Sequence, residues 1–600
     1  MNKNQANERH YSTLCRVLDA LRYEIPRANR EYHPIPATPD ALIQARSRAL
    51  LHLFLKARFG LISYRDRLKC ITDGPHDGGV DAFYVDEKSK KIFLLQSKFR
   101  ASASNFVSHN MSADDVLKMD VKRILKGEKK DESGILYNDS IKGLLQRTVQ
   151  KIPDVGSYTT QVILLGNSKT FTPLQLKKLV EGYSVDQYHH ERIYSDLLFP
   201  VVNGTYYTEP NLKIEINLTN VRGESNLDYD VKTKAVKSNI KILFVPTREI
   251  GRIMHTYKNS ILKYNPRSFL ELQKNPVNQQ IASSIEDEIG NSFALFNNGI
   301  TIISDGTSIS SETAKQGVAQ VVLRNPQLVN GGQTAFTLSR IYEKCFAEND
   351  FSVFKNKEVL LRVITFVGPE RPIDAAARIE LIGDISKASN SQTKIEESDR
   401  RSNDHIQIEL QKAFFEKYGM YYERKLGEFS DGIASGYIDQ TSLVNRERLI
   451  RIGLACDYRA NQARSSISRF FKDEITLATL LKLRDVNKYA YGYEVLRLLE
   501  LKRKERPLVR GDRYHIKQFG QALRYAQYAV VAVCANKGPA KHKSELQVVD
   551  LVLSQWVVFE LWVQKKKTNQ HYKVEGAFDF VNYYKGATIN SDLKEYNFSV

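Results

Sequence analysis

The first 200 residues alternate between helical and extended patterns of apolar positions. Apolar residues recur at helical spacing through Pro39–Phe59, which predicts a helix there. Two apolar runs, Gly79–Val85 and Ile92–Phe99, then flank the charged segment Asp86–Lys91 and predict a β-hairpin. A further helix, strand and helix are expected at Ala113–Leu125, Gln161–Leu165 and Pro173–Gly182. This order of elements is typical of a mixed α/β layer.

The rest of the chain changes from a mixed pattern to a mostly helical one. Phe293–Phe296 and Ile300–Ile303 flank Asn297-Asn298-Gly299, whose residues tolerate positive φ, so a hairpin is predicted. After residue 470 we expect mainly helices, one with Leu477, Leu480, Leu481 and Leu483 and another at Val549–Val563. No long Gly/Ser linker marks the boundaries. The hypothesis is an α/β domain at 1–215, a second α/β domain at 216–470 and a basic helical region at 471–600.

Composition excludes several classes of protein. A chain of 600 residues with 42% apolar residues can bury several cores, so two to four domains are expected. The five cysteines are far apart and form no CxxC pair, which argues against a disulfide framework and a cysteine zinc site. The longest apolar run, Tyr528–Ala535, is too short to span a bilayer, and the N-terminus is polar. We therefore expect a cytoplasmic protein that does not associate with membranes.

An uneven positive charge indicates a polyanionic partner, most simply nucleic acid. The chain has 88 Lys and Arg against 69 Asp and Glu, a net charge of +19, and residues 481–600 hold 21 basic and 12 acidic side chains. Lys502-Arg503-Lys504 and the run Lys565, Lys566 and Lys567 are therefore candidate phosphate contacts. The alternative is a solvated helix end that only aids solubility.

Three residues of the predicted hairpin can form a phosphodiesterase site. Asp81 opens the first strand, and Gln96 and Lys98 lie two apart near the end of the second, on one face. Hydrolysis of a phosphodiester needs a hard cation such as Mg²⁺ or Mn²⁺ held by oxygen ligands. Asp81 and Gln96 offer such oxygens, while Lys98 can orient water or stabilise negative charge. The alternative is a cross-strand salt bridge between Asp81 and Lys98 in an ordinary hairpin.

This pattern resembles the PD-(D/E)XK nuclease superfamily, in particular its Mrr-like branch, whose core reads G-G-[IV]-D…[EQ]-x-K. The matching segments are Gly78-Gly79-Val80-Asp81 and Gln96-Ser97-Lys98. The resemblance implies a restriction-endonuclease-like α/β domain. In it, Asp81 matches the metal-binding acid, Gln96 the second acid position and Lys98 the lysine of the motif. Gln96 is neutral where most members have an acid. Many members also have a Glu in the first helix, where this chain offers only Asp40; Asp77 is a substitute ligand.

The central region resembles the AIPR family, named for abortive-infection phage resistance. The resemblance covers about residues 220–440 and implies an antiviral defence role and a nuclease-like N-terminus. Its segments are Asn265-Pro266-Arg267, Phe296-Asn297-Asn298-Gly299-Ile300-Thr301, Leu328-Val329-Asn330-Gly331-Gly332-Gln333-Thr334, Asn390-Ser391-Gln392-Thr393, Asp399-Arg400-Arg401-Ser402-Asn403-Asp404 and Tyr421-Tyr422-Glu423-Arg424-Lys425.

Polar residues in these segments are candidate ligand or nucleic-acid contacts. Asn330 to Thr334 should end a strand and open a helix at Thr334–Lys344, where backbone amides can hold an anion. The alternative is a tight turn with a helix cap. The candidate residues are Asn297, Asn298, Asn330, Gly331, Gly332, Gln333 and Arg401. The run from Tyr421 to Lys425 suits either base stacking or an ordinary amphipathic strand.

The sequence supports three hypotheses for the function. The first is a metal-dependent endonuclease of prokaryotic phage defence that acts on DNA, with RNA as the alternative substrate, and with the central region as sensor, clamp or platform for a homo-oligomer. The second is a non-catalytic nucleic-acid-binding effector in which the Gln96 site has lost its metal. The third is a hydrolase of nucleotides or other small molecules at the Asn330–Thr334 turn.

Overall fold

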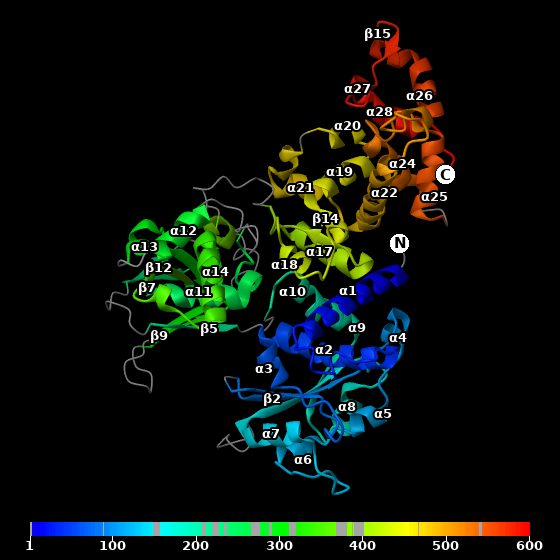
Figure 1. The fold of residues 1–600 in the computed structure, drawn as a ribbon. Helices are drawn as coiled ribbons and strands as arrows, with labels where there is room; N and C mark the ends of the chain where they lie inside the picture. Colours follow the sequence, from blue (N-terminus) through cyan, green and yellow to red (C-terminus); the bar gives the residue numbers. More distant parts are fainter. Residues whose placement is uncertain are drawn as a thin grey trace. The chain divides into compact units, whose positions relative to one another are not determined.

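The mixed α/β class expected from the sequence is confirmed in the computed structural model of the chain (Figure 1). The chain forms two compact units: one contains residues 1–6, 394–426 and 441–600, and the other contains residues 7–393 and 427–440. The structure describes residues 3–87, 89–147, 157–206, 212–218, 227–232, 237–265, 277–286, 291–310, 320–367, 381–386, 388, 401–465, 467–538 and 543–600.

A four-stranded mixed sheet organises the N-terminal part of the chain. Its strands are β1 (Ala82–Asp86), β2 (Lys91–Ser97), β3 (Thr159–Leu165) and β4 (Ser184–Tyr188), in that spatial order. β1 and β2 form the predicted antiparallel hairpin, with Ala82 opposite Leu95, whereas β2, β3 and β4 are parallel. The hairpin and the strand predicted at 161–165 are therefore confirmed.

Helices cover both faces of this sheet (Figure 1). On one face lie α1 (Lys3–Tyr23) and α2 (Pro39–Phe59), and Phe59 at the end of α2 stacks on Tyr84 with ring centroids 4.3 Å apart. α2 has the predicted bounds because Thr38 caps its first turn and Gly60 ends it in the left-handed conformation. The other face packs Phe83 and Leu94 against a core shared with α5 to α8. The remaining helices of this part are α3 (Tyr64–Leu68), α4 (Ala103–Ser108), α5 (Ala113–Leu117), α6 (Val121–Leu125), α7 (Asp139–Arg147), α8 (Pro173–Leu179), α9 (His190–Arg192) and α10 (Phe199–Val202), with a π-helical turn at Ile193–Leu198.

The single helix predicted at 113–125 is wrong, since the chain turns between α5 and α6. This turn packs on the Gly78-Gly79 pair: the Asp120 amide donates to the Gly78 carbonyl oxygen over 2.8 Å. Both glycines have positive φ, and a Cβ atom on Gly79 would lie 2.5 Å from the Lys118 carbonyl oxygen. Only glycine fits this position, because other residues would combine a strained backbone with a steric clash.

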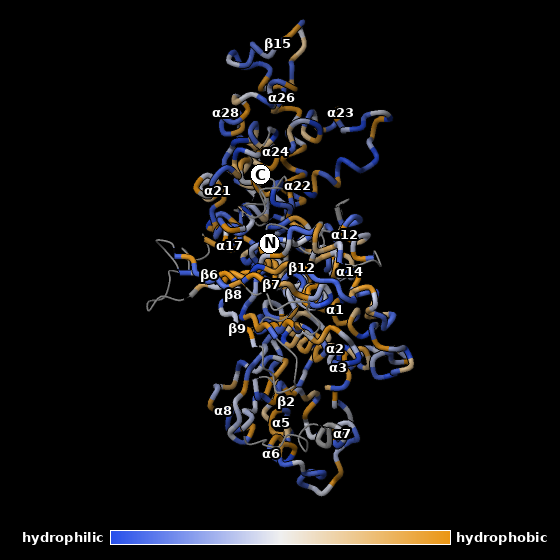
Figure 2. The backbone as a smooth tube through the Cα atoms, turned by 90° about the vertical axis from the view of Figure 1, so that its left-hand side faces the viewer, coloured by the Kyte–Doolittle hydropathy of each residue, from blue (hydrophilic) through white to orange (hydrophobic). Residues whose placement is uncertain are grey.

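Two further sheets belong to the same unit as the N-terminal sheet. One has the order β5-β10-β9, and the other has the order β11-β8-β12-β7-β6. Figure 2 shows hydrophobic positions along the strands near β7, β8 and β12. The strands are β5 (Lys213–Asn217), β6 (Leu227–Lys232), β7 (Lys237–Pro246), β8 (Ile300–Ser304), β9 (Gly306–Ser310), β10 (Gln320–Arg324), β11 (Gln327–Asn330) and β12 (Glu358–Val367), and the helices are α11 (Thr247–Tyr257), α12 (Val277–Glu286), α13 (Ser292–Phe296) and α14 (Gly332–Glu348).

The hairpin predicted at 293–303 is wrong. Residues 293–296 lie in α13, and β8 pairs with β11 and β12 instead. The Asn297 side chain accepts a hydrogen bond from the Gly299 amide, so the Asn-Asn-Gly segment links a helix to a strand. The helix expected after Asn330 is present as α14 and begins at Gly332.

The other unit is mostly helical, as predicted for residues 470–600. Its core includes Trp556 and α24 (Gln527–Lys537), which contains the longest apolar run and is buried from Ala529 to Ala535. The helices predicted at 477–483 and 549–563 are each interrupted, because α21 (Glu474–Leu480) ends before Leu483 and α25 (Glu545–Ser554) and α26 (Trp556–Lys565) are separate. Other elements are α17 (His405–Tyr418), α19 (Arg446–Cys456), α20 (Ala460–Ala463), α22 (Val486–Lys504), α23 (Ile516–Phe519), α27 (Phe580–Tyr583), α28 (Thr588–Glu595), β13 (Tyr421–Glu423), β14 (Leu443–Asn445), β15 (Lys573–Val574) and β16 (Ala577–Phe578); α18 (Ser430–Ala434) belongs to the other unit.

Two sequence expectations concern cysteines and membrane spans. All five cysteines lie in the described residues and are free. Among the described residues, no single helix is long and apolar enough to cross a membrane, whereas α25 and α26 together meet that length and composition but bend by 41° between them.

The contact at Gly79 predicts a specific loss of stability. We expect Gly79→Ala to destabilise the four-stranded sheet by roughly 1–3 kcal/mol more than Gly127→Ala does. Gly127 also has positive φ but has open space where a Cβ atom would be, so it controls for backbone strain. Hydrogen–deuterium exchange of peptides that cover β1 and β2 measures the effect. Equal protection in the two variants would contradict the steric explanation.

Candidate metal site

Asp81 lies at the start of β1, where three backbone segments meet. Its amide donates to the Leu95 carbonyl oxygen on β2 over 2.8 Å. Its own carbonyl oxygen accepts from the amides of Thr72 and Asp73, at 2.9 and 3.0 Å, and Ile71 forms a bridge with Ala82. Residues 71–73 therefore run alongside β1 and bring Asp73 next to Asp81.

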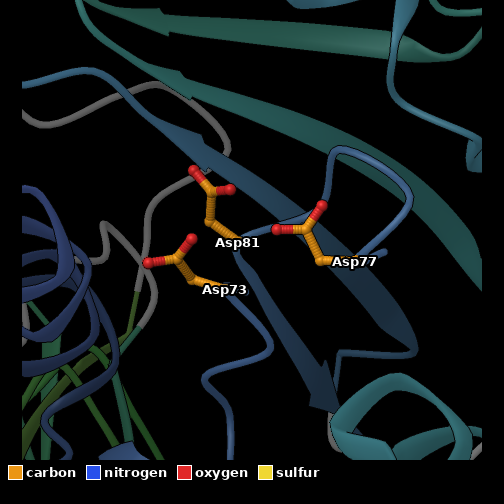
Figure 3. Close-up of side chains that lie close together, drawn as sticks. All are labelled: Asp73, Asp77 and Asp81. Carbon is orange, nitrogen blue, oxygen red and sulfur yellow. The ribbon is translucent and has the colours of Figure 1, made fainter. Parts of the chain in front are cut away.

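Three carboxylates gather at this point. One oxygen from each of Asp73, Asp77 and Asp81 lies within 4.8 Å of the others, and Figure 3 shows Asp73 and Asp77 on either side of Asp81. The structure thus joins Asp77 and Asp81, as predicted, and adds Asp73, which the sequence reasoning missed. The sequence feature that could have indicated Asp73 is the spacing of four residues between successive acids in a segment that contains glycine and proline.

Each of these carboxylates has its own support. Asp81 accepts a hydrogen bond of 2.6 Å from the Ser97 amide at the end of β2. Asp77 accepts from the Gly79 amide at 2.8 Å and the Gly74 amide at 3.2 Å, which fixes the loop before β1. Asp73 pairs with the Arg48 Nε atom at 2.5 Å. Helix α2 therefore contributes a cation to the cluster, while its only acid, Asp40, is exposed.

Burial and nearby negative charge raise the pKa values of Asp77 and Asp81. Burial raises the pKa of Asp81 well above its ordinary value, and the nearby Asp73 and Asp77 add to this shift, while the Ser97 amide and Lys98 oppose it. The pKa of Asp77 is also raised, first by burial, although the amides of Gly74 and Gly79 favour its charged form. A bound divalent cation would offset both effects.

Gln96 and Lys98 both reach Asp115 at α5. The Gln96 Nε2 atom donates to the Asp115 carbonyl oxygen over 2.7 Å, and the Lys98 Nζ atom lies 3.2 Å from the Asp115 carboxylate. Sequence reasoning missed Asp115, which follows Lys98 by 17 residues on another element and carries no local signal. In the described part of the chain no ion pair joins Asp81 to Lys98, so the simple cross-strand salt bridge is not formed.

The donor set fits a hard divalent cation. Three carboxylates supply oxygen ligands, which Mg²⁺ and Mn²⁺ prefer. Gln96 is buried, and its Oε1 atom has no hydrogen-bond partner among the described residues. An unpaired buried amide oxygen is costly unless a ligand satisfies it. The Ser97 amide donates to the Asp81 carboxylate. Gln96 is therefore the chain neighbour of a residue that contacts the acidic cluster.

The Asn330–Thr334 turn is packed against the segment around Gly299. Gly331 has φ of +81°, and a Cβ atom there would lie 2.8 Å from the Gly299 carbonyl oxygen. The Asn297 Nδ2 atom donates to the Thr334 hydroxyl over 2.9 Å, and Asn330 accepts from the Gly331 amide. Gly332 and Thr334 are buried, Gln333 is half-buried and Asn298 is exposed. These contacts favour a structural turn over an anion site.

The remaining candidates lie in the helical unit. Arg401 lies 3.8 Å from the Asp404 carboxylate and donates to the Lys472 carbonyl oxygen. Lys566 pairs with Asp592 and Glu595 at 2.8 and 2.6 Å, whereas Lys565 and Lys567 are exposed. Tyr421 and Tyr422 are buried in β13, so these rings are not available for base stacking. Pro266-Arg267, Asn390-Ser391-Gln392-Thr393 and Asp399-Arg400 lie outside the described residues.

Comparison with known proteins supports one of the two resemblances. Residues 262–552 match the family model described as AIPR protein. This part of the chain is an AIPR domain. The match confirms the family predicted for the central region and extends it to α25, into the helical region expected to begin at residue 471. No curated protein and no solved structure matches the chain. The nuclease assignment of the sheet before the AIPR domain stays a prediction.

The raised pKa of Asp81 predicts how metal binding depends on pH. The metal-free folded protein binds protons more tightly than the unfolded chain does, so its stability should fall as the pH rises above the ordinary carboxyl pKa of 3.8. Cation binding displaces these protons and should therefore strengthen with pH. We expect the rise in Tm caused by Mg²⁺ or Mn²⁺ to grow between about pH 5 and about pH 8.

Two isosteric variants test this prediction by thermal unfolding. Asp81→Asn should raise the Tm of the metal-free protein at the higher pH and abolish the increase caused by the cation, because the buried charge is gone. Asp114→Asn changes an exposed acid of α5 by the same chemistry and should leave the cation effect intact. An undiminished cation effect in Asp81→Asn would exclude Asp81 as a ligand.

Proposed function

We propose that the protein is a metal-dependent endonuclease of prokaryotic phage defence, located in the cytoplasm and acting on DNA rather than RNA. The observation that carries the proposal is the convergence of Asp73, Asp77 and Asp81 beside the Gln96-Ser97-Lys98 segment of β2. The mixed sheet with helices on both faces suits a restriction-endonuclease-like domain. The AIPR domain supports the defence role, since its family is named for abortive-infection phage resistance.

The residues of the cluster have separate tasks in this proposal. Asp73, Asp77 and Asp81 would hold the cation, with the Gln96 oxygen as a further candidate ligand. The cation, when bound, supplies Lewis-acid activation of the phosphate and of the attacking water. Arg48 limits repulsion within the cluster through its ion pair with Asp73. Lys98, with its side chain 41% exposed, can stabilise the negative charge that develops on the phosphate.

The second candidate function is a non-catalytic nucleic-acid-binding effector. One observation favours it: Lys98 is held by Asp115, and Gln96 donates to the Asp115 backbone, so both residues have structural partners. Both candidates predict binding of nucleic acid, but only the nuclease requires that bound Mg²⁺ or Mn²⁺ leads to cleavage.

Plasmid cleavage distinguishes the two candidates. The purified protein should nick or linearise supercoiled plasmid with Mg²⁺ or Mn²⁺ and not with EDTA. Asp81→Asn should lower the initial rate at least about 100-fold, because a ligand of the cation is lost. Asp114→Asn should cleave at the normal rate. Cation binding by the normal protein without any cleavage of DNA or RNA would support the non-catalytic effector instead.

The role of Lys98 requires a separate pair of variants. Lys98→Gln should lower the cleavage rate about 100-fold or more but leave the Tm increase caused by the cation in place, because the lysine acts on the phosphate. Asp115→Asn removes the ion-pair partner of Lys98 and keeps the backbone oxygen that binds Gln96. This variant should retain most of the activity. Normal cleavage by Lys98→Gln would show that the lysine is only structural.

A further inference from the structure

The helical unit carries an arginine-rich surface between α22 and α24. Residues 503–524 contain five arginines and two lysines against two acids. They begin in the last turn of α22, continue through α23 and end shortly before α24. Figure 2 shows the loop next to α23 as mostly hydrophilic. This segment lies within the AIPR domain, and none of its residues belongs to the acidic cluster.

Tyr514 is the centre of this surface. The guanidinium carbons of Arg503, Arg513 and Arg524 lie 5.3, 5.5 and 5.4 Å from the centroid of its ring. We name these three arginines the arginine cluster. Such cation–π contacts hold the planar guanidinium groups near a ring and leave N–H groups free for other partners.

Tyr525 extends this arrangement to a second ring. The Arg524 guanidinium carbon lies 4.6 Å from its centroid, and that of Arg464 lies 5.5 Å away. The Arg464 Nη1 atom is buried and has no hydrogen-bond partner among the described residues. Arg524 therefore contacts two tyrosines, and arginines from separate segments gather around these two rings.

Within the described residues, no carboxylate forms an ion pair with the arginine cluster. Arg503, Arg513 and Arg524 are exposed, and none of them forms an ion pair in the described part of the chain. The nearby Asp512 accepts hydrogen bonds from the amides of Ile516 and Lys517, at 2.8 and 3.0 Å. Its carboxylate thus fixes the turn that presents Tyr514. Three close cations repel one another, and an anion from outside the chain would relieve this repulsion.

We propose that the arginine cluster around Tyr514 binds the phosphodiester backbone of a nucleic acid. Guanidinium groups bind phosphate oxygens through two parallel N–H bonds, and neighbouring arginines suit the regular spacing of backbone phosphates. The choice of ligand rests on the proposed function, in which nucleic acid is the substrate. The same loop exposes Leu508, with 82% of its surface accessible, so an anionic membrane is the competing ligand to test.

Oligonucleotide binding in EDTA tests the proposal without any cleavage. The triple substitution of Arg503, Arg513 and Arg524 by Gln should weaken binding at least about tenfold near physiological salt. It should also lower the slope of log affinity against log salt by about 2 for a single strand, because each phosphate contact contributes about 0.7. The matched control replaces the exposed Lys543, Lys573 and Lys585 by Gln and should change the slope far less.

Substitutions of Tyr514 test whether the ring organises the arginines. Tyr514→Phe keeps the aromatic face and should bind normally, whereas Tyr514→Leu should weaken binding several-fold. Circular dichroism and gel filtration establish that each variant is folded. Equal slopes for the arginine triple variant and its lysine control would overturn the proposal. If the arginine triple variant no longer binds phosphatidylserine vesicles but binds the oligonucleotide normally, the surface is assigned to a membrane.

The outcome is independent of catalysis at the acidic cluster. EDTA removes the divalent cation, so oligonucleotide binding is measured without cleavage, and the control variant Asp114→Asn should bind with normal affinity. If the arginine cluster binds nucleic acid but no metal-dependent cleavage is found, the proposed function fails and the binding surface stands. If cleavage occurs and the arginine triple variant binds normally, the proposed function stands and the binding surface fails.

Discussion

Repulsion among Asp73, Asp77 and Asp81 is the constraint around which the N-terminal sheet is built. Their oxygens lie within 4.8 Å of one another in a partly buried site, where each charge raises the free energy of the next. The fold offsets this repulsion with backbone amides of Gly74, Gly79 and Ser97 and with the Arg48 guanidinium. These partners hold the three carboxylates in place.

The Gly78-Gly79 pair lies between the acidic cluster and the turn that joins α5 to α6. Positive φ at both positions turns the chain sharply between Asp77 and Asp81, and the absence of a side chain on Gly79 lets Lys118 approach. Lys118 belongs to the turn between α5 and α6, and Asp115 in α5 contacts Gln96 and Lys98. The acidic cluster and the Gln96–Lys98 segment therefore depend on one tight contact that only glycine allows.

The sequence predicted those features that local patterns determine. Two apolar runs on either side of a charged turn predicted the β1–β2 hairpin, and the helical spacing of apolar residues predicted α2. The breaks between α5 and α6 and before Ile300 were missed because they depend on tertiary contacts, with Gly79 and with strands β11 and β12. In the site, Asp77, Asp81 and Gln96 were found from a linear motif. Asp73 and Asp115 were missed because backbone pairing and the packing of α5 bring them there.

The two sites have opposite charges, and in the part of the chain that the structure describes each has few ion-pair partners. Three carboxylates share one ion pair with Arg48, while the arginine cluster around Tyr514 has no ion pair among the described residues. Leaving like charges together destabilises a fold, so such arrangements are more often found where a ligand binds. Under the two proposals, the phosphates of a nucleic acid would neutralise the arginines, and a divalent cation held by Asp73, Asp77 and Asp81 would offset the repulsion among these carboxylates. Each proposal thus assigns to a site a ligand of the opposite charge.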